Sequence, residues 1–468
     1  MTLARTLFRE YDVRGRVPEV FPDATNELSD DGVRLLGRAF GTLARERGRT
    51  GVVVGHDLRT YSARLKDRFV EGLAASGADV LDAGCCLTPT LYFGQIHLNC
   101  PAGAMITASH NPQGWSGMKL ATEFVTTLGP DDIKRLKTLC DDGPLASGRG
   151  TVRAVDLREA YLHEMATRVH PPRPLKVVLD CGNGTASYFA PEAFARAGFD
   201  VVPLYCEPDA TFPHHFPNPS ETANRLAVRA KVVETGADLG LSFDGDGDRL
   251  GVEDERGRSV NADLVLMLLA RQVLARTPGA PVVFDVKCSQ ALIDDIVAHG
   301  GTPVMWKTGH SHIKSKMKEV GAPIAGERSG HIFLKEGWFG FDDGVFAGLR
   351  LAEFVAQAGK PLSTLLAEAP PYVTSPEIHV DCGDEVKYGV VDRLTAEFQR
   401  DVPGRVNTIN GARVSFPDGW GLVRASSNLP ELVLVFEGKT QAAMDRIKAD
   451  FRARLGRHRE VGATWHNE

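Results

Sequence analysis

The sequence predicts an α/β protein of three similar α/β domains, with mixed but largely parallel sheets, followed by a C-terminal α+β domain. Three observations lead to this prediction. One strand–helix–strand pattern recurs three times, roughly the last hundred residues depart from it, and 468 residues are too many for one compact core. Strands that alternate with helices favour parallel pairing, whereas strands joined by tight turns favour antiparallel pairing.

The repeated pattern is a buried strand, a turn, an amphipathic helix, a glycine that ends the helix and a second strand. Its copies begin at the apolar runs 52–54, 177–179 and 282–284. In the first copy the apolar stripe of the helix is formed by Leu65, Phe69 and Leu73. Gly77 follows as the expected cap.

The C-terminal part is typical of an α+β domain. Residues 412–416 and 420–424 flank the turn sequence 417–419, Pro-Asp-Gly, which predicts an antiparallel hairpin. A further strand is expected over 432–436 and an amphipathic helix over 440–455.

A Pro-rich stretch at 368–371 is the expected linker before this last domain. The four domains are therefore expected at 1–152, 153–255, 256–368 and 369–468. No low-complexity segment interrupts them.

Composition argues against several classes of protein. A hydrophobic content of 43% and a charged content of 24% are ordinary for a globular protein, and a net charge of −6 argues against a nucleic-acid binder. No apolar run approaches the ~20 residues of a membrane span, so no membrane association is expected. Eight cysteines without C-x-x-C spacing predict reduced thiols and a cytoplasmic location. No obligate protein partner is implied.

Three carboxylates on alternate positions, Asp244, Asp246 and Asp248, directly follow a strand-length apolar run at 239–243. Carboxylates this close repel one another unless a cation, here best Mg²⁺, lies among them. A calcium loop of the EF-hand type is one alternative, but Arg249 stands where that loop needs glycine and the flanks are strand-like. A solvated acidic turn is the other alternative.

A second loop of interest is 107–112, Thr-Ala-Ser-His-Asn-Pro, which follows the apolar residues 104–106. Ser109 in this loop is a candidate nucleophile, although a hydroxyl needs a base or a metal to assist it. By itself the loop fits a helix-capping serine equally well.

Together, the strings 107–112, 244–249 and 326–331 resemble those of the α-D-phosphohexomutase family, in order along the whole chain. The runs 285–288, 306–311 and 338–344 resemble the bifunctional phosphomannomutase/phosphoglucomutase branch in particular. This resemblance implies four domains around a central active-site cleft, each contributing one loop.

The resemblance implies that Ser109 is phosphorylated in the resting enzyme. Mg²⁺ would be held by Asp244, Asp246 and Asp248, with a phosphoserine oxygen of Ser109 completing its ligands. The reaction would move phosphate reversibly between C1 and C6 of a mannose or glucose phosphate. It would pass through a bound glucose or mannose 1,6-bisphosphate, which would also act as activator.

The same resemblance assigns the substrate contacts. Glu327 and Ser329 would bind two adjacent ring hydroxyls, and a carboxylate beside a hydroxyl suits a polyol on its own chemistry too. Arg328 occupies a position that varies in the family and leaves the sugar preference open. The phosphate clamp would comprise Arg424, Ser426, Ser427 and Asn428, although its order departs from the commoner Arg-x-Ser-Asn-Thr.

Proton transfer is expected from residues that resemble the family's active-site set. Lys119, Arg249 and His331 would line the reacting groups, with Lys119 placed ahead of His331 as base if its pKa is lowered. Four further residues match positions near the substrate: Tyr11, Arg14, Lys287 and His310.

Three other strings are expected to be structural. The sequence 182–184 predicts a tight turn, His214 and His215 lie in a loop without a third metal ligand, and the pair Asp342 and Asp343 is expected to cap a helix that starts near Gly344.

Three rival functions are considered. One is a mutase for glucosamine phosphate, which the runs 306–310 and 338–344 disfavour. Another is a Mg-dependent sugar phosphatase, which four enclosing loops disfavour because closure excludes water. The third is a non-enzymatic sugar-phosphate binder, which would be expected to have lost Ser109 or an aspartate.

Overall fold

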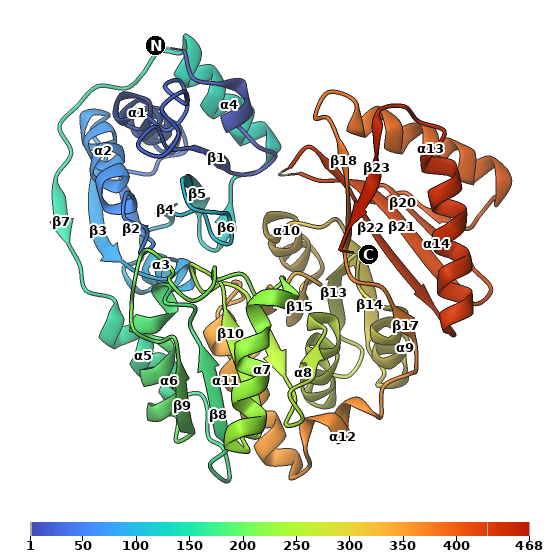
Figure 1. Ribbon diagram of the computed structural model, residues 1–468. Coiled ribbons are helices and arrows are strands. Elements are labelled where there is room, and N and C mark those ends of the chain that lie inside the picture. Colours follow the sequence, from blue (N-terminus) through green and yellow to red (C-terminus); the bar gives the residue numbers. More distant parts are fainter. Residues whose placement is uncertain (1, 428, 468) are drawn as a thin grey trace.

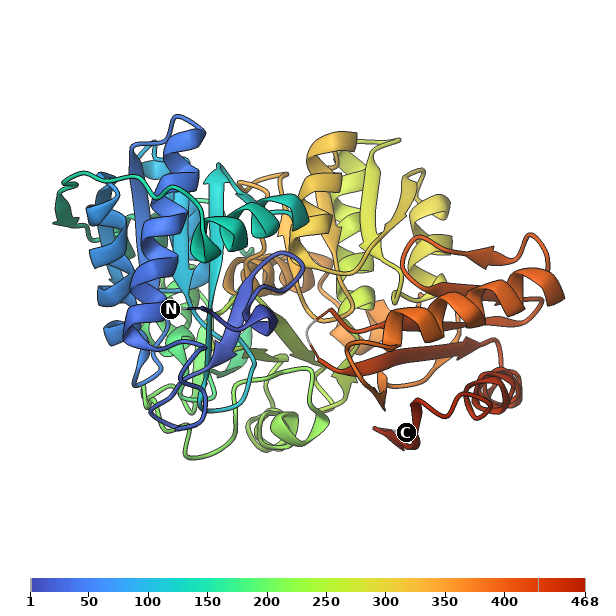
Figure 2. The same cartoon turned by 90° about the horizontal axis from the view of Figure 1, so that it is seen from above.

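The computed structural model describes residues 2–427 and 429–467 and folds them into four domains, each built on its own sheet (Figure 1). Seen from above, the fourth domain lies at the opposite end of the molecule from the first (Figure 2). Among the described residues, no helix is both long and apolar enough to cross a membrane.

The first domain carries a seven-stranded sheet in the order β1-β5-β4-β2-β3-β7, with β6 beside β5. Its strands are β1 (Val13–Arg16), β2 (Gly51–His56), β3 (Asp79–Cys85), β4 (Ala102–Ile106), β5 (Trp115–Glu123), β6 (Thr126–Thr127) and β7 (Val152–Ala154). Its helices are η1 (Arg5–Leu7), α1 (Asp30–Glu46), α2 (Ser62–Ala75), α3 (Thr88–His97) and α4 (Pro130–Asp141). The predicted stripe of Leu65, Phe69 and Leu73 is fully buried, and Gly77 takes a left-handed φ of 87° just after α2.

The second domain has a five-stranded sheet in the order β12-β11-β10-β8-β9. Its strands are β8 (Lys176–Asp180), β9 (Asp200–Leu204), β10 (Leu239–Phe243), β11 (Leu250–Glu253) and β12 (Ser259–Val260). Its helices are α5 (Arg158–Ala166), η2 (Thr185–Tyr188), α6 (Ala190–Arg196), η3 (Thr222–Arg225) and α7 (Leu226–Thr235). The apolar run at 239–243 is thus the fully buried strand that the sequence predicts.

The third domain has a four-stranded sheet in the order β14-β13-β15-β16. Its strands are β13 (Pro281–Asp285), β14 (Thr302–Trp306), β15 (Ile324–Gly326) and β16 (Ile332–Leu334). Its helices are α8 (Ala262–Arg276), α9 (Gln290–Ala298), α10 (His310–Val320), α11 (Gly344–Ala358) and α12 (Leu362–Leu366).

These three domains share one arrangement, which confirms the repeated pattern. In each, two parallel strands flank the first strand of the repeat, and an antiparallel strand then extends the sheet. The antiparallel neighbours are β5 beside β4, β11 beside β10, and β16 beside β15. The loop before each antiparallel strand is the one that carries the candidate site residues, so the three loops are structurally equivalent.

The fourth domain has an antiparallel sheet in the order β19-β20-β21-β22-β18-β23, with β17 beside β22. Its strands are β17 (Val373–Thr374), β18 (Ile378–Cys382), β19 (Val406–Asn407), β20 (Ala412–Phe416), β21 (Gly419–Ala425), β22 (Glu431–Gly438) and β23 (Val461–His466). The helices α13 (Lys387–Asp401) and α14 (Gln441–Leu455) cover one face (Figure 1). The predicted hairpin is confirmed as β20 and β21, which pair up to Phe416 and Gly419.

The cores of the domains differ in how far they merge. One apolar cluster joins parts of the first three domains, and the first domain has a further core of its own, whereas the core of the fourth domain is separate from both. Between the third and fourth domains lies a small cluster of Val286, Trp420, Leu422 and Val435. The fourth domain is therefore attached through a limited apolar contact.

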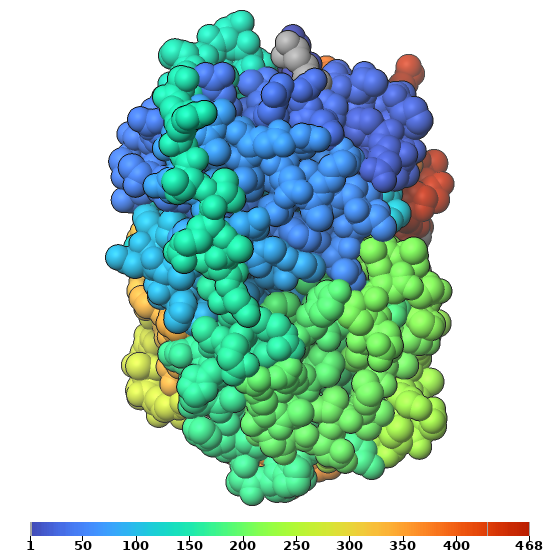
Figure 3. All heavy atoms as spheres, turned by 90° about the vertical axis from the view of Figure 1, so that its left-hand side faces the viewer, coloured from blue at the N-terminus to red at the C-terminus, as the bar shows by residue number. Residues whose placement is uncertain are grey.

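Strand pairing places two domain ends a few residues beyond the expected boundaries at 152 and 255. β7 pairs with β3 and so belongs to the first sheet, and β12 pairs with β11 and belongs to the second. The connection between the first two domains runs over the outer surface of the molecule, from the upper blue part to the lower green part (Figure 3).

Candidate active site

A cavity of about 680 Å³ lies where the four domains meet. The side chains that line it come from every domain. Thirteen of the predicted site residues are among them: Tyr11, Arg14, Ser109, Lys119, Arg249, Lys287, His310, Glu327, Ser329, His331, Arg424, Ser426 and Ser427. The predicted residue Asn428 lies outside the described residues.

The serine loop between β4 and β5 is held by Asp57, which follows β2. Asp57 Oδ2 accepts hydrogen bonds from Thr107 Oγ1 at 2.8 Å and from the Ala108 amide at 3.2 Å. Arg59 donates to the Ser109 carbonyl at 3.0 Å. Ser109 itself has a φ of 51°, a left-handed conformation that costs a non-glycine residue about 1 kcal/mol or more. The surrounding bonds therefore hold the serine in a conformation that it would not adopt alone.

Ser109 meets the aspartate loop of the second domain. Its Oγ donates a hydrogen bond to Asp244 Oδ2 at 2.7 Å, although the two residues are 135 positions apart. A Cβ at Gly245 would lie only 2.6 Å from the Ser109 carbonyl oxygen. The close approach of the two loops thus requires glycine at position 245.

The three aspartates Asp244, Asp246 and Asp248 are fully buried, and one oxygen of each lies within 4.8 Å of the others. Burial and the neighbouring charges of Asp248 and Asp246 raise the pKa of Asp244 well above its ordinary value. Among the described residues, Asp246 Oδ1 and Asp248 Oδ1 have no hydrogen-bond partner. Buried carboxylate oxygens without donors, in a group with excess negative charge, fit a hard divalent cation such as Mg²⁺.

Lys119 on β5 reaches into this aspartate group. Its ammonium donates to Asp246 Oδ2 at 2.8 Å and also contacts Asp248. Burial alone would lower the pKa of Lys119, but the two carboxylates outweigh burial and raise it well above its ordinary value. This direction is opposite to the one that a general base requires.

The third loop, between β15 and β16, places Glu327 and Ser329 at the cavity. Glu327 Oε1 accepts a hydrogen bond from the Gly309 amide at 2.6 Å, and burial raises the pKa of Glu327. The neighbouring His310 packs edge-on against Tyr11, with ring centroids 5.1 Å apart. Residues of the first and third domains thus form one wall of the cavity.

The fourth loop, between β21 and β22, contributes Arg424, Ser426 and Ser427. Arg424 faces the cavity because side chains alternate along β21: Trp420 and Leu422, on the same face as Arg424, pack against the third domain. Arg424 NH2 donates to Ser427 Oγ at 3.2 Å.

Lys287, predicted near the substrate phosphate, forms an ion pair with Glu377 of the fourth domain at 2.7 Å. The lysine is 5% exposed and lies at the cavity wall. An anionic ligand would therefore compete with Glu377 for this ammonium.

Arg328 is not among the cavity-lining residues, although it lies between Glu327 and Ser329. Its guanidinium donates to the Ser375 carbonyl at 2.7 Å and to Thr374 Oγ1 at 3.2 Å. Arg328 therefore connects the third loop to the segment that enters the fourth domain.

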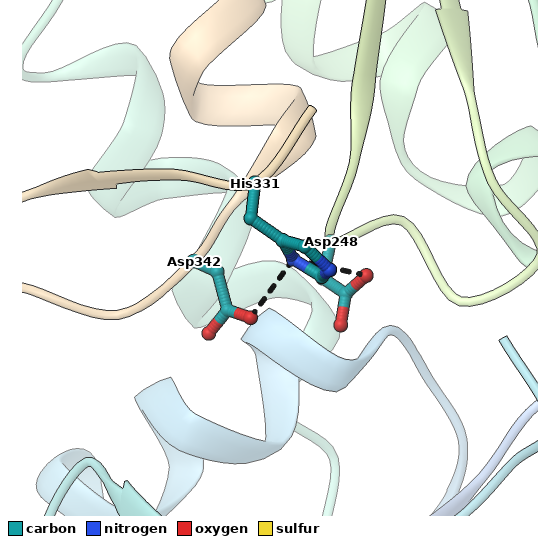
Figure 4. Close-up of side chains that lie close together, drawn as sticks. All are labelled: Asp248, His331 and Asp342. Atoms are coloured by element: carbon teal, nitrogen blue, oxygen red, sulfur yellow. Dashed lines mark ion pairs between the residues drawn. The ribbon is translucent and has the colours of Figure 1, made fainter. Parts of the chain in front are cut away.

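The predicted capping role of Asp342 and Asp343 is correct for only one of them. Asp343 Oδ1 accepts from the Phe346 amide at 2.9 Å and caps α11. Asp342 instead lies 3.1 Å from Nδ1 of His331, and Asp248 lies 3.6 Å from the same atom (Figure 4). Helix capping needs only one of two adjacent side chains, which leaves the other free to point elsewhere.

Several cavity residues are not predicted from the sequence. The fourth domain contributes Glu377, just before β18, His379 on β18 and Glu431 on β22, and His379 pairs with Glu431 at 3.0 Å. No motif marks them, because they reach the cavity only through the placement of that domain. Asp57, which does not line the cavity, is also not predicted, because it meets the serine loop only through the pairing of β2 with β4.

The residues expected to be structural behave as such. His215 bonds to Asp180 at 3.0 Å and His214 to Asn183 at 2.8 Å. Asn183, within the predicted turn, has a left-handed φ of 58°. All eight cysteines are free.

Comparisons with known proteins agree on one family. Four family models match the chain in succession: "Phosphoglucomutase/phosphomannomutase, alpha/beta/alpha domain I" over 5–144, domain II over 159–257, domain III over 261–372 and the C-terminal domain over 377–454.

Full-length relatives show the same likeness. A phosphomannomutase/phosphoglucomutase of Pseudomonas aeruginosa is 42% identical over 97% of this chain and 96% of the relative. A phosphoglucomutase of Neisseria meningitidis is 41% identical over 96% of this chain and 97% of the relative. The crystal structure of a phosphoglucomutase/phosphomannomutase family protein from Burkholderia thailandensis superposes with a TM-score of 0.89 at 38% identity, covering 97% of this chain and 98% of that one.

Proposed function

The chain belongs to the phosphoglucomutase/phosphomannomutase family, and we propose that Ser109 is the residue that carries the phosphoryl group in its reaction. As a member of this family the protein is a hexose-phosphate mutase, an intramolecular phosphotransferase that moves phosphate between C1 and C6 of the sugar. The mannose and glucose phosphates are its proposed substrates.

The observation that carries the assignment of Ser109 is its hydrogen bond to Asp244. The donor is a serine hydroxyl at the cavity, and the acceptor belongs to a buried acidic group with two unpartnered oxygens. An alcohol that must give and receive a phosphoryl group needs positive charge beside it, because the reaction is governed by positioning and electrostatics. A cation held by this acidic group would supply that charge. A helix cap would not need such a neighbour.

Asp244, Asp246 and Asp248 are proposed to hold Mg²⁺. The bound ion would offset the negative charge of the phosphoryl group during transfer. The protein itself fixes the positions of the two loops, since Asp57 holds the serine loop and Gly245 lets the aspartate loop approach it.

The remaining loops are proposed to bind the two ends of the sugar phosphate. Glu327 and Ser329 suit the ring hydroxyls, whereas Arg424 with Ser426 and Ser427 suits the phosphate that is not reacting. Lys287 and His310 would lie beside the substrate phosphate. Tyr11 and Arg14 would line the cavity on the side of the first domain.

The 1,6-bisphosphate is proposed as intermediate and activator. In one half-reaction the bond from Ser109 Oγ to phosphorus breaks and a bond from the sugar oxygen to phosphorus forms, while the sugar hydroxyl loses its proton. After the intermediate turns over, the reverse transfer returns the other phosphate to Ser109. Lys119 and His331 both line the cavity, but the raised pKa of Lys119 disfavours the lysine, so His331 is the proposed proton acceptor. A cytoplasmic location and the lack of an obligate partner remain predictions.

Intact-mass analysis with peptide mapping tests the proposal. Protein incubated with glucose 1,6-bisphosphate should gain one phosphoryl group on Ser109, and Ser109→Ala should lose roughly 10³-fold or more of its turnover. Ser415→Ala, an exposed serine on β20, is the matched control. Isomerisation by protein that never carries phosphate on Ser109 would refute the assignment.

Product analysis separates the rival reactions. Mannose, glucose and glucosamine phosphates are compared as substrates, and released inorganic phosphate is measured beside the isomer. A mutase yields isomer in large excess over phosphate, whereas a phosphatase yields the reverse.

A further inference from the structure

The ring of His331 has a defined proton position because of its neighbour Arg249. Arg249 Nε donates a hydrogen bond to His331 Nε2 at 3.1 Å. A guanidinium keeps its protons at any pH near neutrality, so Nε2 must be the acceptor in this pair. A neutral imidazole carries a single proton, which therefore lies on Nδ1.

The Nδ1 atom of His331 faces two carboxylates. Asp342 Oδ2 lies 3.1 Å from it and Asp248 Oδ1 lies 3.6 Å from it, as the dashed lines in Figure 4 mark. The histidine side chain is 5% exposed and both carboxylates are fully buried. Neither Nδ1 nor Asp342 Oδ2 has a hydrogen-bond partner among the described residues, so the 3.1 Å ion-pair contact joins two buried polar atoms that are otherwise unpartnered.

The other oxygen of Asp342 is held by a buried lysine. Lys314 on α10 donates to Asp342 Oδ1 at 3.1 Å and to the Tyr92 hydroxyl at 3.1 Å. Its ammonium also lies 4.2 Å from the centroid of the Tyr92 ring. Asp342 therefore has a buried counter-ion on one oxygen and the Nδ1 atom of His331 at 3.1 Å from the other.

The same three groups, Asp248, His331 and Asp342, are close enough to hold a metal ion. A ligand nitrogen must offer a lone pair to the metal, however, and Nδ1 has its proton when Nε2 accepts from Arg249. Lys314 already neutralises Asp342. The arrangement favours a series of polar contacts from Lys314 through Asp342 to His331 over a second metal site.

We propose that Asp342 is a positioning residue, which fixes the tautomer and orientation of His331 with Lys314 as its counter-ion. Through His331 it also holds the guanidinium of Arg249 at the cavity wall. The consequence for turnover rests on the proposed mutase function, whereas the tautomer of His331 does not.

The substitution Asp342→Asn tests this series of contacts with little change in the shape of the side chain. The carboxylate offers acceptors to both Lys314 and His331, but an amide has one oxygen and one NH₂ group. If its oxygen stays with the ammonium, the NH₂ opposes the Nδ1 proton. The ring should then move its proton to Nε2, which turns a donor toward Arg249 and loosens both side chains.

Nitrogen NMR of full-length protein labelled with ¹⁵N-histidine measures the tautomer directly, and His331→Gln assigns the signals. The wild-type protein should show His331 protonated at Nδ1, and Asp342→Asn should shift the proton toward Nε2. A wild-type ring protonated at Nε2, or the same tautomer in both proteins, overturns the proposal. These outcomes are independent of catalytic activity.

Steady-state kinetics provide the second readout. Asp342→Asn should lower kcat roughly 10²-fold while KM stays within about threefold, because the substrate contacts are intact. The control Asp295→Asn changes an aspartate that lies beside His299 and Arg271, away from the cavity, and should stay within about twofold of wild type. A loss expressed mainly in KM contradicts a positioning role.

The double variant Lys314→Met with Asp342→Asn separates positioning from general structural damage. Without the ammonium, the amide oxygen can turn to the Nδ1 proton of His331. The double variant should therefore regain the Nδ1 tautomer and about tenfold in kcat over Asp342→Asn alone. Additive damage in the double variant overturns the proposal. If wild-type protein forms no isomer at all, the mutase function fails instead, while the NMR result still stands.

Discussion

The ammonium of Lys119 lies 2.8 Å from a carboxylate oxygen of Asp246, inside the group of aspartates that is proposed to bind Mg²⁺. The lysine belongs to the first domain and the aspartate to the second. Their contact means that a protein cation and a metal ion compete for the same buried carboxylate groups, which leads to the first prediction.

Lys119→Met should tighten Mg²⁺ binding while it abolishes turnover. The substitution removes a competing positive charge and leaves the carboxylates in place, so the dissociation constant should fall by about tenfold. Isothermal titration calorimetry measures it. Lys134→Met, which removes a lysine that is 78% exposed, is the control and should bind as wild type does. Unchanged or weaker binding in Lys119→Met would contradict the competition.

Removal of divalent cations should stop isomerisation, and added Mg²⁺ should restore it. Because the ion would bind only the folded aspartate group, Mg²⁺ should also raise the unfolding temperature by several degrees, about as much as 1–2 kcal/mol of linkage provides. Thermal scans with and without Mg²⁺, at equal ionic strength, check this.

The Mg²⁺ effect should depend on the buried aspartates alone. Asp246→Asn should remove the thermal shift, whereas Asp381→Asn, at a side chain that is 80% exposed, should retain it. A shift that persists in Asp246→Asn would place the bound ion elsewhere.

Arg328→Met should leave the choice between mannose and glucose phosphates almost unchanged. The guanidinium points away from the cavity and donates to Ser375, so the ratio of kcat/KM values for the two sugars should change by less than about threefold. Thermal stability should fall, because a link to the fourth domain is lost. Coupled assays on both sugars test this.

Glu327→Gln provides the contrast, since it should lower kcat/KM for both sugars by roughly 10²-fold. A reversal of sugar preference in Arg328→Met would show that this side chain reaches the substrate after all.

Asp343→Asn should make the protein more resistant to unfolding at alkaline pH. Burial raises the pKa of Asp343 to about 7, whereas an unfolded aspartate titrates near 3.9. Between these two pKa values the folded state therefore binds more protons than the unfolded state. The contribution of the protonated Asp343 to stability is complete below about pH 4 and is lost as the pH rises through about 7. Asparagine cannot ionise and still caps α11.

Urea unfolding at about pH 5.5 and about pH 8.5 measures this effect. The gain of Asp343→Asn over wild type should grow by about 2 kcal/mol between the two conditions. Asp381→Asn should show no such growth. A gain that does not depend on pH would mean that Asp343 stays ionised throughout.

Much of the local structure was accessible from short stretches of sequence. The run 239–243 forms β10 and the aspartates follow it directly, because an uninterrupted apolar run and a glycine-rich turn are features of neighbouring residues. The hairpin of β20 and β21 was predicted for the same reason. Thr440 as the cap of α14 agrees with the helix expected from 440 onward.

Contacts between residues that are separated along the chain were not accessible in this way. Asp57 and Ser109 cooperate through the pairing of β2 with β4, and Glu377 reaches Lys287 only across a domain boundary. The pair Asp342 and Asp343 shows the limit most clearly. Neighbouring identical side chains received the same interpretation, yet one caps a helix and the other faces His331.

Periodicity, turn chemistry and charge spacing are properties of adjacent residues, and they sufficed for the repeated strand–helix units, the metal loop and the candidate serine. Which carboxylate contacts which cation depends on how the elements pack within and between the four domains, since a buried charge pairs with a group on the element packed against it. Lys119 among the aspartates, Arg328 turned to the fourth domain and Lys314 behind Asp342 are therefore consequences of packing, because each needs a partner that is distant along the chain.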